Sequence, residues 1–188
     1  MRDAAKTKEL IEKTALRLFV EKGVAETTIR DIASTAGIAE GTMYRHYPSK
    51  DALAWSLFKE NLTWLVRDLD LLQQDHRKLK GKLEAMIRRF CAFFDEDRYL
   101  FSYLLLYLHG QHRRVTKDMP HPEFLLRGVI AEGMARGEIP KGDADVAAAM
   151  VVGIVRQLAV SILFGRMSRS LSSLADTLVA AAWRVLKR

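Results

Sequence analysis

Two short helical segments flank Gly37, and this pattern limits the possible folds more than any other feature of the chain. Thr28 and Asp31 have the spacing of a capping box, which marks the start of a helix. Gly37 permits the positive φ of a tight turn. Pro48 ends the second segment, because the residue before a proline is disfavoured in the helical conformation. The pattern predicts a helix-turn-helix over about residues 27–46, whose second helix enters the major groove of DNA.

The rest of the chain is also predicted to be helical. Long stretches are rich in Ala, Leu, Arg, Lys and Glu, and only four prolines interrupt them. The expected helices span residues 7–22, 28–36, 39–46, 49–72, 78–95, 97–110, 122–137, 143–166 and 171–187. We therefore expect an all-α protein of about nine helices, with an N-terminal three-helix bundle.

The second helix of the motif carries side chains that suit a DNA surface. Gly41 has no side chain and lets the helix lie close to the duplex. Tyr44 and His46 can place polar groups on phosphates, and Lys50 adds a charge beside the N-terminal amides of the next helix. Arg30, on the first helix, could reach a guanine edge. The candidate DNA-contacting residues are Thr28, Arg30, Glu40, Gly41, Thr42, Tyr44, His46, Tyr47 and Lys50.

Two positions in this region, Tyr47 and Glu40, leave alternatives open. Tyr47 could contact a phosphate, or its ring could pack in the core and show only the hydroxyl. Met43 is expected to pack inward. Glu40 places an acid beside a polyanion, so it either accepts from a cytosine amine or turns aside.

The stretch TTIRDIASTAGIAEGTMYRHYPSKDAL, with LFVEKG before it, resembles the DNA-binding signature of the tetracycline-repressor (TetR) family. The close resemblance covers about residues 7–65, and the remainder is similar only in architecture. It implies a DNA-binding domain at 1–48 and an effector-binding and dimerisation domain at 49–188. It also implies a homodimer on a near-palindromic operator, acting as a repressor that a small-molecule effector releases.

The net charge of +7 does not locate the DNA site. Residues 1–60 hold ten basic and nine acidic side chains, so most of the excess lies in residues 61–188. A basic protein is attracted to a polyanion in general, but here the motif must identify the surface.

The sequence favours a cytoplasmic protein without a membrane anchor. The N-terminus has no apolar stretch of the secretory kind, and a single cysteine, Cys91, cannot form an internal disulfide. Residues 146–164 are largely apolar, but a spanning helix would place Arg156 near the bilayer centre at a cost of roughly 3 kcal/mol. A helix buried in a bundle or a dimer interface explains this segment better.

The middle and last helices provide candidates for the effector pocket and the dimer interface. Aromatic residues are frequent in the middle helices and suit a largely apolar ligand, although at helical spacing most of these rings are expected to be ordinary core. The candidate pocket residues are Phe90, Phe94, Tyr99, Tyr103, Tyr107 and His109. The resemblance implies a four-helix interface between protomers, and small residues there allow close approach. The candidate interface residues are Ala149, Gly153, Gln157 and Ala181.

No pattern in the chain predicts a metal, a cofactor or catalysis. His109 and His112 are three residues apart, with His121 further on, but no acid or thiol follows at metal-ligand spacing. The chain lacks a glycine-rich phosphate loop and a nucleophile elbow. The alternative to a regulator is a helical protein-interaction module, which would have no reason to expose Tyr44 and Lys50.

Overall fold

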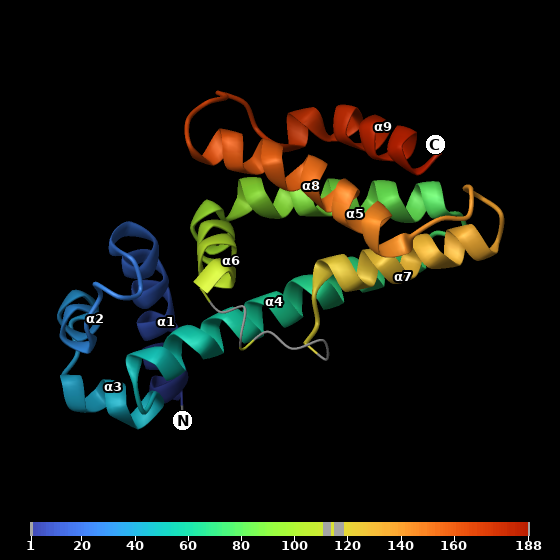
Figure 1. The fold of residues 1–188 in the computed structure, drawn as a ribbon. Coiled ribbons are helices and arrows are strands. Elements are labelled where there is room, and N and C mark those ends of the chain that lie inside the picture. Colours follow the sequence, from blue (N-terminus) through green and yellow to red (C-terminus); the bar gives the residue numbers. More distant parts are fainter. Residues whose placement is uncertain (1, 111–113, 115–118, 188) are drawn as a thin grey trace. The chain divides into compact units, whose positions relative to one another are not determined.

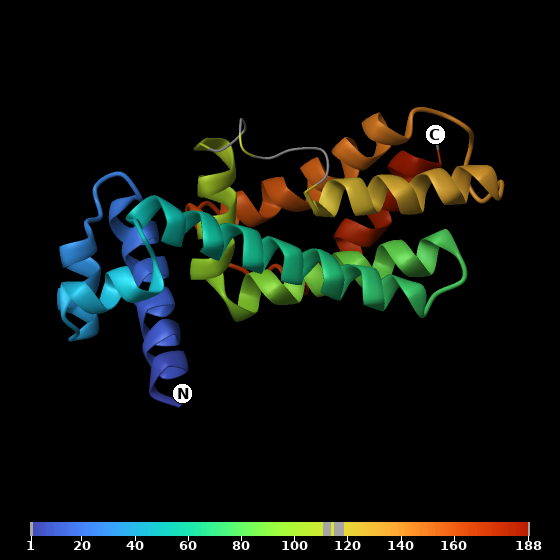
Figure 2. The same cartoon turned by 90° about the horizontal axis from the view of Figure 1, so that it is seen from below.

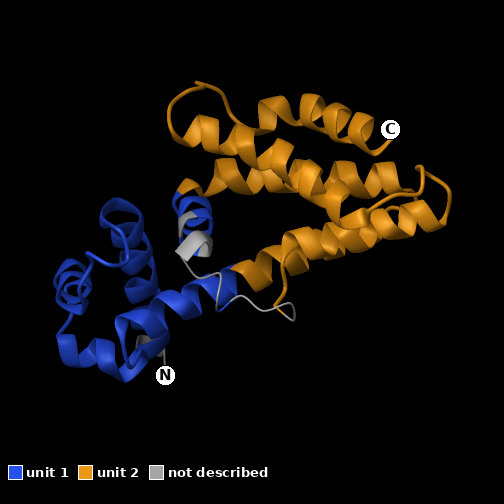
Figure 3. Ribbon diagram, viewed as in Figure 1, with its two compact units in different colours: residues 1–61, 99–115 blue, residues 62–98, 116–188 orange. Residues whose placement is uncertain are grey.

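The computed structural model describes residues 2–110, 114 and 119–187. Within these ranges the chain forms nine α-helices and one short 3₁₀ helix, and no strand. The predicted all-α fold is confirmed. Contacts between the helices divide the chain into two compact units, which Figure 3 colours separately.

Unit 1 comprises residues 1–61 and 99–115. Its helices are α1 (Arg2–Lys22), α2 (Ile29–Ala36), α3 (Glu40–His46), the first part of α4 (Lys50–Gln74) and α6 (Arg98–Gly110) (Figure 1). α1 begins five residues earlier than the sequence predicts, since the expected start was at residue 7. α2 lies against both α1 and α3.

The core of unit 1 joins α1, α4 and α6 through aromatic side chains. Phe19 of α1 stacks on Tyr103 of α6, with ring centroids 5.9 Å apart. Tyr103 also stacks on Tyr107, and its hydroxyl donates to the Ala54 carbonyl oxygen at 2.5 Å. Burial of such rings removes a large apolar area from water, so α6 is held firmly in this unit.

Unit 2 comprises residues 62–98 and 116–188. It contains the rest of α4 with α5 (Leu79–Glu96), α7 (Pro122–Ala135), α8 (Ala144–Leu163), the 3₁₀ turn η1 (Ser172–Leu174) and α9 (Ala175–Leu186). α8 contacts α7 and α9, and α5 contacts the same two helices from another side (Figures 1 and 2). α4 and α5 are joined by an ion pair between Arg89 and Asp68 at 2.5 Å.

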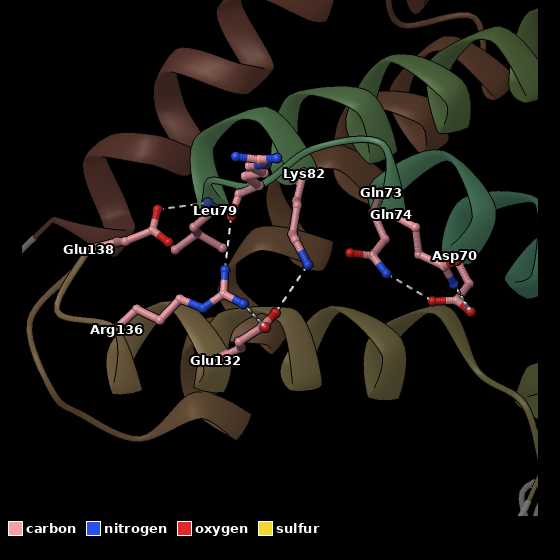
Figure 4. Close-up of polar contacts among 9 residues, drawn as sticks. Asp70, Gln73, Gln74, Leu79, Lys82, Glu132, Arg136 and Glu138 are labelled. Atoms are coloured by element: carbon pink, nitrogen blue, oxygen red, sulfur yellow. Dashed lines mark hydrogen bonds and ion pairs between the residues drawn. The ribbon is translucent and has the colours of Figure 1, made fainter.

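A polar cluster ties α5 to α7 and to the residues that follow α7 (Figure 4). The Glu138 carboxylate accepts from the Leu79 backbone N–H at 2.7 Å and so caps the start of α5 from a distance. Lys82 pairs with Glu132 at 3.0 Å, and its side chain is only 13% exposed. These contacts fix α5 and α7 relative to each other around the apolar interior of unit 2.

α8 has both a buried face and an outward apolar face. Among the described residues it is the one helix long and apolar enough to cross a membrane, and 28% of its apolar stretch is buried. Ala148, Val151 and Val155 face inward. On the outward face, Val146 is 49% and Met150 is 53% exposed.

Candidate DNA-binding and effector sites

The first helix of the motif begins and ends as its sequence predicts. The Thr28 hydroxyl oxygen accepts from the Asp31 N–H at 3.0 Å, and the Thr28 N–H donates to the Asp31 carboxylate at 2.9 Å. Those bonds from the Thr28 N–H and hydroxyl lower the pKa of Asp31. Gly37 ends the helix with φ 67°, the left-handed conformation expected of it. The predicted capping box and turn are confirmed.

Apolar residues fasten the two short helices to the core of unit 1. Ile32 of α2 and Met43 of α3 are fully buried, and Ala33 is 1% exposed. The inward position predicted for Met43 is confirmed. With this face sealed, the other residues of α3 are exposed or, at Thr42 and His46, half-buried.

α3 presents polar and aromatic side chains on its open face. Tyr44 is 56% exposed. A Cβ added at Gly41 would meet nothing of the protein within 4 Å, so internal packing gives no reason for a glycine there. Arg45, which we did not select from the sequence, is exposed and donates to the Thr42 hydroxyl at 3.1 Å. Its position next to Tyr44 was the signal that could have identified it.

The predicted DNA-contacting residues fall into three groups by exposure. The exposed members are Thr28, Arg30, Glu40, Gly41 and Tyr44, the half-buried members are Thr42, His46 and Lys50, and the buried member is Tyr47. Eight of the nine residues are thus reachable from solvent. They lie on α2 and its N-cap, on α3, and at the first residue of α4.

Tyr47 packs in the core, which was one of the two positions that the sequence left open for it. It is 6% exposed, and its hydroxyl donates to the Glu12 carboxylate of α1. Burial, followed by this hydrogen bond, raises the pKa of Tyr47. The residue anchors the end of α3 to α1, and its hydroxyl is already engaged within the protein.

Lys50 combines a structural contact with a place at a helix start. Its ammonium group donates to the Ala25 carbonyl oxygen at 2.8 Å, ahead of α2. The Ser49 hydroxyl oxygen beside it accepts from the Ala52 N–H at 3.0 Å and caps α4. The lysine therefore stands at the junction of the motif with α4, positively charged and half-buried.

Unit 2 contains a partly open apolar cavity of about 70 Å³ between α4, α5, α7 and α8. Its lining contains no polar side chain. The residues around it are Leu69, Leu83, Met86, Ile87, Phe90, Pro122, Leu126, Val151, Val152 and Val155. Such a site favours an apolar ligand group, since a polar group inside would lack a hydrogen-bonding partner.

The predicted effector-pocket residues are not gathered in one place. Phe90 lines the cavity, whereas Tyr103 and Tyr107 belong to the aromatic core of unit 1. Phe94 is fully buried, and Tyr99 is 50% exposed. The side chain of His109 lies outside the described residues, as does His112. The aromatic content of the middle helices thus reports core packing more than ligand contact.

Cys91 and the histidines do not form a reactive or metal-binding cluster within the described residues. Cys91 is buried, and the loss of hydration raises the pKa of its thiol to about 11. No group of three or more His, Cys, Asp or Glu side chains converges in the described part of the chain.

The predicted interface residues lie on the outer sides of α8 and α9. Ala149 and Gln157 are exposed, and Gly153 and Ala181 are half-buried. A Cβ added at Gly153 would meet nothing within 4 Å, so this glycine is open to an approaching surface.

A capped helix-turn-helix with an open second helix, joined to a helical unit that contains an apolar cavity, defines the class of DNA-binding transcriptional regulators. Residues 11–57 match the family model described as bacterial regulatory proteins, tetR family. The HTH-type transcriptional repressor KstR2 of Rhodococcus jostii (strain RHA1) is 42% identical over 140 residues, which cover 70% of this chain and 67% of that protein. The chain belongs to the tetR family.

Solved structures share the fold over nearly the whole chain. The fatty acid degradation regulator FadR from Bacillus halodurans superposes with a TM-score of 0.83 at 20% identity, covering 93% of each chain. FadR from Bacillus subtilis, solved in complex with stearoyl-CoA, gives a TM-score of 0.75 at 21% identity, covering 93% of this chain and 96% of that chain. At these identities the likeness concerns the fold alone.

Proposed function

We propose that the protein is a homodimeric repressor that binds a near-palindromic operator and is released by a largely apolar effector. The observation that carries DNA binding is the two-sided character of α3, where Met43 is fully buried and Tyr44 is 56% exposed. We assign contacts to residues on this open surface. They are Thr28, Arg30, Glu40, Gly41, Thr42, Tyr44, Arg45, His46 and Lys50. Tyr47 is omitted because its hydroxyl bonds Glu12.

Dimerisation is supported by the outward face of α8. Val146 and Met150 expose apolar side chains on the same side of the helix as Gly153 and Gln157. A contiguous exposed apolar surface of this kind marks an interaction site. A second copy of the chain would bury it and would also supply the second helix-turn-helix that specific binding to two half-sites requires.

The effector is proposed to bind in the apolar cavity of unit 2. Leu83, Ile87 and Val155 and the other lining residues offer only hydrocarbon surface. The stearoyl-CoA complex of the structural relative FadR supports a ligand with an apolar portion. Ligand and operator would oppose each other through a coupling free energy of typically about 1–3 kcal/mol.

We divide the functions at the start of α4, with DNA binding in residues 1–48 and effector binding and dimerisation in 49–188. Unit 1 also includes α6, so this boundary separates functions and not packing units. A DNA partner places the protein in the cytoplasm, where it acts by binding and not by catalysis.

Fluorescence anisotropy with operator fragments selected from genomic DNA tests the DNA-binding proposal. Tyr44→Ala should weaken operator binding about ten-fold or more, as expected for a lost contact, without changing the folded dimer. Tyr99→Ala is the matched control, because Tyr99 on α6 is 50% exposed. Affinity should also fall steeply with salt. Equal binding by parent and Tyr44→Ala would refute the contact assigned to Tyr44, and binding without sequence preference would favour the protein-interaction module instead.

A further inference from the structure

A second hollow lies in unit 2, between α4 and the start of α7. It is an open groove of about 470 Å³, within the size range of small-molecule sites. Unlike the apolar cavity, it is lined by a mixture of apolar, polar and charged side chains. These are Thr63, Val66, Arg67, Asp70, Met119, Pro120, His121, Phe124 and Leu125.

The groove and the apolar cavity adjoin along the same two helices. On α4, Leu69 lines the cavity and Asp70 lines the groove. At the start of α7, Pro122 lines the cavity and His121 lines the groove. Neighbouring α-carbons are about 3.8 Å apart, and successive helical side chains point in directions about 100° apart. The two hollows therefore lie on neighbouring faces of α4 and at the start of α7, lined by residues that are adjacent in sequence.

Arg67 brings an uncommitted positive charge to the groove. Its side chain is exposed and makes no ion pair or hydrogen bond with any residue in the described ranges. Asp70, one turn further along α4, is already engaged, since its two carboxylate oxygens accept from the side-chain amides of Gln73 and Gln74, each at 3.0 Å (Figure 4). Both Asp70 oxygens are thus hydrogen-bonded within α4, while its negative charge stays in the groove.

His121 adds a second donor. Its Nδ1 accepts from the Glu123 N–H at 3.3 Å, so the proton of a neutral ring sits on Nε2. Burial lowers the pKa of His121, which favours the neutral form of the ring. The imidazole packs against the Phe124 ring, with centroids 5.4 Å apart, which holds it at the edge of the groove.

We propose that this groove binds the anionic head group of the effector, a carboxylate or a phosphate, with Arg67 as its ionic partner and His121 as a hydrogen-bond donor. The apolar tail of the same molecule occupies the neighbouring cavity. This inference rests on the proposed function and specifies the ligand class as an amphipathic anion. An arginine suits either head group, because its planar guanidinium pairs with both kinds of oxyanion.

Calorimetric titration of the protein with octanoate, octyl phosphate and octanol separates the head group from the tail. The two anions should bind at least ten-fold tighter than octanol, a fold-change of the size expected for a hydrogen-bonded charge. Arg67→Gln should remove about this advantage and leave octanol binding unchanged. Comparison of octanoate with octyl phosphate tells whether a carboxylate or a phosphate is preferred.

A second variant should raise the affinity for anions, where Arg67→Gln lowers it. Asp70→Asn removes a negative charge from the same groove while keeping an oxygen that can accept from Gln73, so anions should bind several-fold tighter. Arg169→Gln is the matched control, because it removes one exposed arginine charge from unit 2 outside both hollows. Arg67→Lys should restore part of the anion affinity.

Each outcome bears on a different claim. If anions and octanol bind equally, or if Arg67→Gln and Arg169→Gln lower anion affinity alike, the head-group site is overturned while the apolar effector cavity stands. If none of the three probes binds the parent protein, the apolar effector itself fails, and the head-group site fails with it. Circular dichroism melts of each variant show that the fold is retained.

Discussion

α3 and α8 both turn one face to the core and one to solvent, but the outward faces differ in chemistry. On α3, Met43 is fully buried and Tyr44 is 56% exposed among polar neighbours. On α8, Val151 is 1% exposed and Met150, one position earlier, is 53% exposed among apolar neighbours. A polar face is stable in water without a partner, whereas an apolar face is not. The difference indicates a polyanion for α3 and another protein surface for α8.

The two regions also differ in how their structure is specified. α2 and α3 are set by contacts within a few residues, such as the Thr28–Asp31 capping box and the left-handed turn at Gly37. The helices of unit 2 are set by contacts between distant residues, such as Glu138 with the start of α5. Substitutions should therefore act locally in the motif and over long distances in unit 2.

The largest effect is expected at the outward face of α8. Gly153→Glu adds a charge where a Cβ meets nothing of its own chain, so the protomer should still fold. A charge buried without a partner between protomers is costly, and we expect a monomer by sedimentation velocity. Loss of the second half-site should then lower operator affinity by about a thousand-fold or more.

Gly128→Glu on α7 is the matched control, because Gly128 is exposed and equally unobstructed. It should remain dimeric and bind the operator like the parent. A dimeric Gly153→Glu protein would show that the interface does not include this face of α8. The inference of a protein partner for α8 would then be wrong.

The next effect concerns the interior of unit 2. A Cβ at Gly133 of α7 would lie 2.5 Å from Leu79 Cδ2 of α5, so Gly133→Ala forces the two helices or the leucine to move. We expect the free energy of unfolding to fall by about 1–3 kcal/mol, measured by urea titration. Gly128→Ala on the same helix meets open space and should be neutral or stabilising by up to about 1 kcal/mol. Equal stability of the two variants would show that α5 and α7 are not closely packed there.

Much of the motif could be predicted from the sequence because its signals are short in range. The capping box at Thr28, the turn at Gly37 and the inward side of Met43 all follow from residues a few positions apart. The hydrogen bonds from Tyr47 to Glu12 and from Lys50 to Ala25 could not be predicted, since they join residues 35 and 25 positions apart. Helical periodicity does not tell which side chains of two helices meet.

The effector site was less predictable for the same reason. Periodicity identifies inward faces, but an aromatic residue such as Tyr103 can fill the core of one unit as readily as line a ligand site in another. The cavity is instead lined mainly by aliphatic residues of four helices, and Phe90 is the member of the predicted set that lines it. The groove beside it forms where α4 packs near the residues before α7, and no local sequence pattern predicts that contact.

A smaller effect should separate folding from DNA binding within α3. Gly41→Ala improves helix propensity by up to about 1 kcal/mol and meets nothing within the protein, so the melting temperature should rise. On DNA the added methyl group would hold the helix away from the groove, and operator affinity should fall about ten-fold, comparable to one mismatched base pair. Differential scanning calorimetry and anisotropy measure the two quantities. Unchanged affinity would mean that this position does not approach the duplex.

The smallest effect tests whether α2 is specified locally. Thr28→Ala removes the hydroxyl that accepts from the Asp31 N–H, at a cost of about 1 kcal/mol in the free energy of unfolding. For a domain of this size that corresponds to a melting temperature lower by about 2–4 °C. Thr28→Ser keeps the hydroxyl and should melt like the parent. If Thr28→Ala melts like the parent as well, tertiary contacts of Ile32 alone hold α2, and the motif is then specified by distant packing just as unit 2 is.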